Sequence, residues 1–118
     1  MKKRTRPTPA QADDIRRVKK ALLPLFPKRV RFNIEVWSGA GDDALCWLGS
    51  RGVWQIRLNA SLDDGCFQDS LIHEFAHALA GGNWEREGAH GAVWGVCFAA
   101  CYRSFIEGRS PQVNKRKK

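Results

Sequence analysis

The residues best suited to chemistry form the segment His73-Glu74-Phe75-Ala76-His77, an HExxH motif. Two histidines four positions apart lie one above the other on a helix face, so both imidazoles can bind one metal ion. The glutamate after the first histidine then lies beside the metal, where it can take a proton from a zinc-bound water. We therefore expect His73 and His77 to be zinc ligands and Glu74 to be the catalytic base.

A third histidine completes the expected ligand set. The chain holds 3 histidines, and the one outside the motif is His90. Gly81-Gly82 and a polar loop separate it from His77, so the chain can fold back to bring His90 to the same metal. Three protein ligands leave one position of a tetrahedral zinc for water, as a catalytic site requires.

The pattern around the motif predicts a helix. Asp63 and Asp64 are the expected N-caps, and Gly81-Gly82 is the expected helix stop. Between them apolar residues recur at every fourth position and define one buried face, formed by Phe67, Leu71, Phe75 and Leu79.

The remaining elements predict an α+β fold. Ala10 to Leu23 has helical periodicity, and Val30 to Val36 alternates like a half-buried strand. Two further short strands, Ala44 to Leu48 and Val53 to Leu58, are joined by a segment with hairpin composition. We expect a small three-stranded antiparallel sheet, with Val53 to Leu58 as the edge to which an extended peptide substrate could pair. A final helix from Gly91 is expected to bury Val93, Trp94, Cys97, Phe98, Cys101 and Phe105.

The net charge of +8 is concentrated at the two ends of the chain. Residues 1–9 and 111–118 are basic and without acids, which is typical of disordered, solvated tails. The segment 10–110 between them is expected to form one domain. The tails, together with the basic cluster from Arg16 to Arg31, could attract DNA, and solubility is the alternative reading.

Cysteine usage and hydropathy predict the compartment. Cys46, Cys66, Cys97 and Cys101 show no CxxC pair, and no apolar run is long enough to cross a bilayer. The start of the chain does not resemble a secretory signal. We expect a cytoplasmic monomer with reduced thiols and no membrane partner, associated with the nucleoid if it binds DNA.

Three segments together resemble the SprT-like domain, the protease domain of Spartan-type proteins. They are Trp54 to Leu58, Leu71 to Ala78, and Glu85 to Gly91 followed by Trp94, and the similarity covers roughly residues 10–107. The resemblance implies a minimal zincin fold, zinc ligands at His73, His77 and His90, and Glu74 as base. It also implies a role in cutting proteins on or crosslinked to DNA. The family often has Gly-His-Gly where this chain has Ala89-His90-Gly91, and many members carry a further zinc ribbon after the protease domain.

The expected function is zinc-dependent hydrolysis of peptide bonds in a protein or peptide substrate. Tyr102 and Arg86 are the candidates for stabilising the oxyanion, and Trp84 could line a substrate cleft or stack on an exposed base. Three alternatives remain: a DNA-binding module with a structural zinc, a partner-binding protein with a degenerate protease fold, and a repressor-cleaving peptidase of a mobile element.

Overall fold

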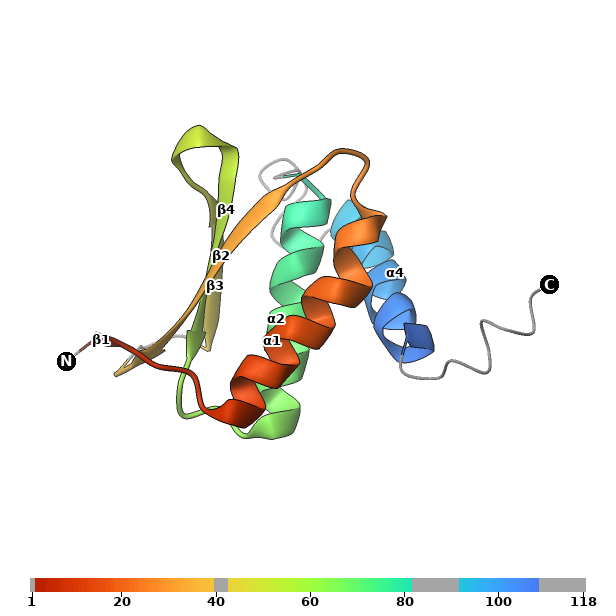
Figure 1. Ribbon diagram of the computed structural model, residues 1–118. Helices are drawn as coiled ribbons and strands as arrows, with labels where there is room; N and C mark the ends of the chain where they lie inside the picture. The colour runs from red at the N-terminus through yellow and green to blue at the C-terminus, as the bar shows by residue number, and fades with distance from the viewer. Residues whose placement is uncertain (1, 40–42, 82–91, 109–118) are drawn as a thin grey trace.

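A sheet of four strands and a layer of helices on one of its faces make up the described part of the chain, residues 2–39, 43–81 and 92–108, in a computed structural model (Figure 1). The elements, in chain order, are β1 (Lys3–Thr5), α1 (Pro9–Leu22), β2 (Arg31–Ser38), β3 (Ala44–Leu48), β4 (Val53–Asn59), α2 (Asp64–Leu79) and α4 (Ala92–Gly108). This arrangement confirms the predicted α+β class.

The sheet differs from the predicted antiparallel meander. Its strand order is β1-β2-β4-β3, and only the β3–β4 hairpin and the β1–β2 pair are antiparallel. The two central strands, β2 and β4, run parallel, with Ile34 opposite Ile56. The reason lies in burial: β4 buries Ile56 and Leu58 to 1% exposure and occupies the centre, whereas β3 carries exposed apolar residues and lies at the edge. Alternation within each strand does not encode this order.

The fourth strand comes from the basic N-terminal segment. The sequence predicts a disordered tail over residues 1–9, whereas Lys3 to Thr5 form β1 and pair with β2, Arg4 lying opposite Trp37. Backbone hydrogen bonds to β2 order this segment, and its side chains contribute no apolar face that a pattern could reveal. The other expected tail, residues 111–118, lies outside the described residues.

Helix α1 begins at a capping box. The Thr8 hydroxyl accepts from the Gln11 amide at 3.1 Å, and the Gln11 side chain accepts from the Thr8 amide at 2.9 Å. The observed helix matches the predicted one within one residue at each end. The apolar residues that give the segment its helical period are Ala12, Ile15, Val18 and Leu22. Of these Val18 and Leu22 are buried, whereas Ala12 is exposed and the polar Gln11 is buried. Gln11 is tolerated there because it donates to the carbonyl of Ala60 at 3.2 Å.

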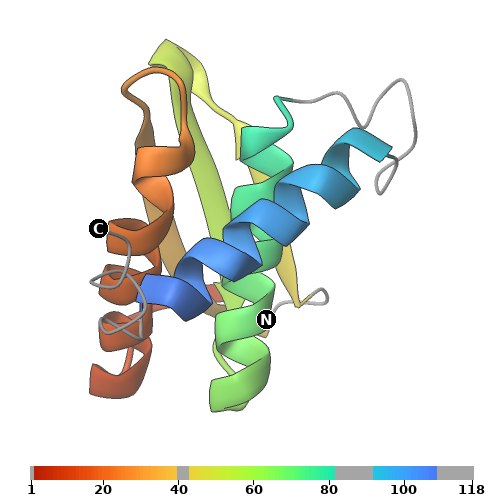
Figure 2. The same ribbon diagram turned by 90° about the vertical axis from the view of Figure 1, so that its right-hand side faces the viewer.

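Helix α2 packs against β3 and β4, with α1 beside it (Figures 1 and 2). Asp63 caps it as predicted, accepting from the Cys66 amide at 2.9 Å, and Gly81 follows its end with φ of 68°. Figure 2 shows α4 crossing α2 obliquely on the side away from the sheet. Helices α2 and α4 contribute these buried residues to the hydrophobic core: Phe67, Leu71, Ile72, Phe75, Ala76, Cys101 and Phe105.

None of the helices in the described ranges is both long enough and apolar enough to cross a membrane.

Candidate metal centre

His73 and His77 lie one turn apart on α2, as the motif predicts. Their ring centroids are 4.9 Å apart and their planes are inclined by 65°. Both side chains are half-buried, so they face a protected region that solvent can still reach. Two neighbouring imidazoles in such a position are a donor pair that suits zinc.

Helix α4 supplies an aromatic wall beside the two histidines. The Trp94 ring lies 4.9 Å from the His73 centroid and 5.7 Å from that of His77. Phe98 stacks on Trp94 at 4.9 Å with an interplanar angle of 11°. This wall holds the imidazoles from one side and lowers the polarity around them, which strengthens electrostatic interactions at the site.

Glu74 is the buried member of the motif. Its side chain is 7% exposed, and this burial raises the pKa of its carboxyl to about 7. Cys46 of β3 lies close to it: burial first, and the Glu74 charge second, raise the pKa of the Cys46 thiol to about 12. Glu74 therefore lies between the histidine face of α2 and the inner face of β3. A cation bound by the two histidines would favour the ionised form of this carboxyl.

A cleft of about 640 Å³ opens beside these residues. Three elements form it: the start of β3, the histidine face of α2 and the inner side of α4. Its lining residues are Asp43, Ala44, Asp69, Ser70, His73, Glu74, Phe98 and Tyr102. The cleft is thus large enough for a peptide segment or a comparable ligand, and it places His73 and Glu74 within reach of one.

Part of the expected site lies outside the described residues. These are the third expected ligand, His90, and the two loop candidates, Trp84 and Arg86. Among residues 2–39, 43–81 and 92–108, no group of three or more His, Cys, Asp or Glu side chains is placed to hold a metal ion. Tyr102, the other oxyanion candidate, does line the cleft together with His73 and Glu74.

The strand predicted to be a free sheet edge, where an extended substrate could pair, is not an edge in the structure. Val53 to Leu58 falls in β4, which is paired on both sides, by β2 and by β3, and so has no free edge. The edge beside the cleft is β3, whose first residue, Ala44, lines it. The prediction was wrong because it took the last strand of the hairpin to be the outer one.

Several residues that line the cleft were not predicted from sequence motifs, for different reasons. Asp69 and Ser70 precede His73 by one helical turn, so helical spacing alone could have placed them on the same face. Asp43 and Ala44 reach the cleft only because β3 lies next to α2, which depends on the strand order. Phe98 was expected to point inward from its helix, but nothing in the sequence indicates that it lies beside the histidines.

The basic cluster on α1 is partly neutralised within its own helix. Arg16 pairs with Asp13, and Arg17 pairs with Asp13 at 3.2 Å and with Asp14 at 3.0 Å. These arginines are therefore less available to phosphates than their number suggests.

The chain matches no protein-family model, no curated protein and no solved structure with which it was compared. Evidence on function therefore comes from its own residues.

Proposed function

We propose that this protein is a zinc-dependent metallopeptidase of the SprT-like type, with His73, His77 and His90 as metal ligands. The observation that supports the proposal best is the juxtaposition of the half-buried His73–His77 pair, the buried Glu74 and a cleft against an edge strand. In a structural zinc site four protein ligands fill the coordination sphere, and such a site does not require a buried carboxylate beside an open cleft. Hydrolysis uses all three features.

Each residue has a distinct task in this reaction. Zinc, when bound, would polarise the substrate carbonyl and acidify the attacking water. Glu74 accepts the proton of that water and passes it to the departing amine. Burial raises the pKa of this carboxyl, and a bound cation would act against that rise and favour the carboxylate, the form that can accept the proton. Tyr102 also lines the cleft, and its hydroxyl is our candidate donor to the developing oxyanion.

We further infer that the substrate is an extended polypeptide segment bound alongside β3. An edge strand presents backbone groups to which a peptide can pair without any particular sequence. Ala44 at the start of β3 opens into the cleft that holds His73 and Glu74, so a peptide following this edge passes the catalytic residues. Unfolded or loosely folded proteins are the substrate class that meets this requirement.

The decisive experiment measures zinc content and cleavage of an unfolded protein for the natural chain and for Glu74→Gln. We expect both proteins to bind one zinc and only the natural chain to cut. Glu107→Gln is the matched control, because it makes the same chemical change on the exposed side of α4, and it should cut like the natural chain. Cleavage by Glu74→Gln, or zinc bound without cleavage by either protein, would refute the proposed activity. Stimulation by single-stranded DNA would favour an action on DNA-associated proteins.

A further inference from the structure

The face of the sheet turned away from the helices carries an unusual set of side chains. Residues alternate along each strand, so β2 buries Phe32, Ile34 and Val36 against the helices and presents the residues between them on the opposite face. The cross-strand pairing adds Arg4 from β1, Leu45 and Trp47 from β3, and Gln55 and Arg57 from β4. We call this the outer face; it comprises Arg4, Arg31, Asn33, Glu35, Trp37, Leu45, Trp47, Gln55 and Arg57.

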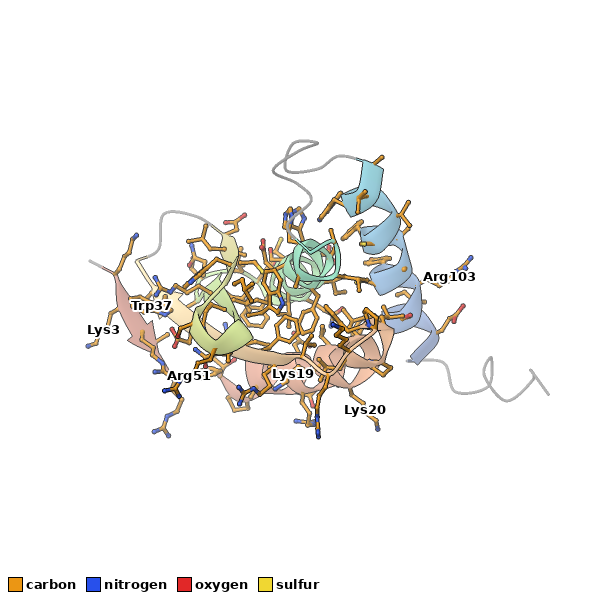
Figure 3. All side chains as sticks on the ribbon, turned by 90° about the horizontal axis from the view of Figure 1, so that it is seen from above. Lys3, Lys19, Lys20, Trp37, Arg51 and Arg103 are labelled. Atoms are coloured by element: carbon orange, nitrogen blue, oxygen red, sulfur yellow. The ribbon has the colours of Figure 1, made fainter. Side chains whose placement is uncertain are left out.

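Two tryptophans and an arginine form the centre of the outer face. The Arg57 guanidinium lies 4.0 Å from the Trp37 ring centroid and 5.2 Å from that of Trp47. The three residues come from three adjacent strands, and Trp47 is 40% exposed. Figure 3 shows Trp37 and Lys3 on the side of the molecule opposite Arg103 of α4. This surface is therefore separate from the cleft between β3, α2 and α4.

Hydrogen bonds fix the polar residues around this centre. The Trp37 indole donates to Glu35 at 2.9 Å, and Asn33 donates to Glu35 at 3.0 Å and to Gln55 at 2.9 Å. Arg4 lies 3.7 Å from the same carboxylate. The Trp37 ring and the Asn33 side chain are thus held in place before any ligand arrives, which reduces the entropy lost on binding.

The charge of the outer face is positive. Arg4, Arg31 and Arg57 lie on it against a single acid, Glu35, among the described residues. The pairing of β1 with β2 also brings the acid-free N-terminal segment, with Lys2, Lys3 and Arg6, to the same edge of the sheet. A polyanion is the partner that this distribution complements.

We propose that the outer face binds single-stranded nucleic acid, with bases stacking on Trp47 and on the plane of Arg57, which itself lies over Trp37. Exposed aromatic rings on a four-stranded sheet stack two or three unpaired bases in known recognition modules, and arginine planes stack on bases as well. Arg4, Arg31 and the N-terminal lysines would contact the phosphates. A duplex hides its base faces and fits this surface poorly.

The test compares binding of three labelled strands of equal length to the full chain: oligo(dT), oligo(rU) and an abasic strand that has phosphates without bases. Fluorescence anisotropy at fixed salt gives the affinities. Trp47→Leu should weaken oligo(dT) or oligo(rU) binding about tenfold and leave the abasic strand unchanged, since stacking contributes about 1–3 kcal/mol per base. The ratio between the two nucleic acids separates DNA from RNA as the source.

A matched pair of charge variants distinguishes the outer face from general attraction. Arg57→Gln and Arg103→Gln remove the same charge on opposite sides of the molecule, and the Arg103 side chain is 79% exposed. We expect Arg57→Gln to weaken binding about fivefold and Arg103→Gln to change it by less than about twofold. Circular dichroism verifies that each variant is folded. Absent binding, equal losses for the two arginine variants, or a Trp47 effect that persists on the abasic strand would overturn the proposal.

Discussion

The phenyl ring of Phe32 on β2 stacks on the ring of Phe75 on α2, with centroids 4.4 Å apart and planes inclined by 22°. Phe26 meets both rings edge-on, at 5.6 Å and 6.4 Å. Phe75 is fully buried and is the central residue of the HExxH motif. Its contact with the sheet therefore fixes the rotation of α2 and, with it, the directions in which His73 and Glu74 point.

Replacement of Phe75 by alanine should be among the most destabilising single changes in the chain. A buried Phe→Ala substitution costs about 3–5 kcal/mol, a large part of the stability of a domain this size. We expect urea unfolding of Phe75→Ala to show this loss, together with a lower zinc content. Val96→Ala is the control, because Val96 is 72% exposed, and its effect should stay within about 0.5 kcal/mol. Equal stability of the two variants would contradict the structural role given to the aromatic stack.

The candidate site could be predicted from sequence where local rules determine it. Three local signals define α2 to within two residues: the cap at Asp63, the apolar residues at every fourth position and the stop at Gly81. The positions of His73, Glu74 and His77 on the helix follow from these signals. The aromatic wall and the cleft could not be predicted in the same way. They depend on how α4 crosses α2 and on which strand lies outermost, and such long-range packing leaves no local signature.

The sheet shows the same division between local and long-range determinants. Strand positions for β2, β3 and β4 follow from alternation and agree with the structure within two residues. The parallel pairing of β2 with β4 was missed, because either order of the hairpin strands satisfies their alternation. β1 was missed because Lys3-Arg-Thr5 has no apolar period and gains its order from pairing with β2.

Glu35 should make the stability of the protein depend on pH. The hydrogen bond from the Trp37 indole, then that from Asn33 and the charges of Arg4 and Arg57, hold the pKa of Glu35 below its usual range despite partial burial. Because the folded-state pKa is the lower one, the ionised carboxylate stabilises the fold above the unfolded-state value of about 4.3, and this contribution is lost as pH falls through the folded-state pKa.

We therefore expect Glu35→Gln to be less stable than the natural chain at pH 7, with the difference shrinking as the pH falls from about 5 to about 3. Urea unfolding at several pH values measures both proteins. Glu107→Gln provides the comparison, because the Glu107 side chain is 48% exposed on α4. Its difference from the natural chain should remain within about 0.5 kcal/mol throughout. A Glu35→Gln gap that is constant with pH would show that the carboxylate charge contributes nothing to folding.

Metal removal should lower the melting temperature if the proposed ligands bind zinc in the folded state only. Free zinc at 100 times its dissociation constant stabilises a folded protein by about 2.7 kcal/mol. A chelator should remove this stabilisation from the natural chain. The His77→Ala variant lacks one of the two histidines on α2, so its melting temperature should change little when zinc or chelator is added. The same response in both proteins would place any bound zinc elsewhere.

Two glycines offer the same substitution with opposite expected signs. Gly81 ends α2 with φ of 68°, and its amide donates to the carbonyl of Ala78 at 2.9 Å. A Cβ there would meet no atom within 4 Å, so any cost of Gly81→Ala comes from the left-handed backbone alone, about 1–2 kcal/mol. Gly95 lies exposed within α4, where a Cβ also meets nothing. There alanine restricts the unfolded chain and favours the helix, so Gly95→Ala should stabilise by about 0.5–1 kcal/mol.

Thermal and urea unfolding of Gly81→Ala and Gly95→Ala check this pair in one experiment. Because both substitutions add one methyl group in open space, packing cannot account for a difference between them. A loss at Gly81 and a gain at Gly95 would show that α2 ends in the left-handed conformation immediately before the segment that leads to His90. A gain at both positions would mean that α2 does not end in this conformation. The direction in which the backbone continues after Gly81, away from the His73–His77 face of α2, would then differ from the one described.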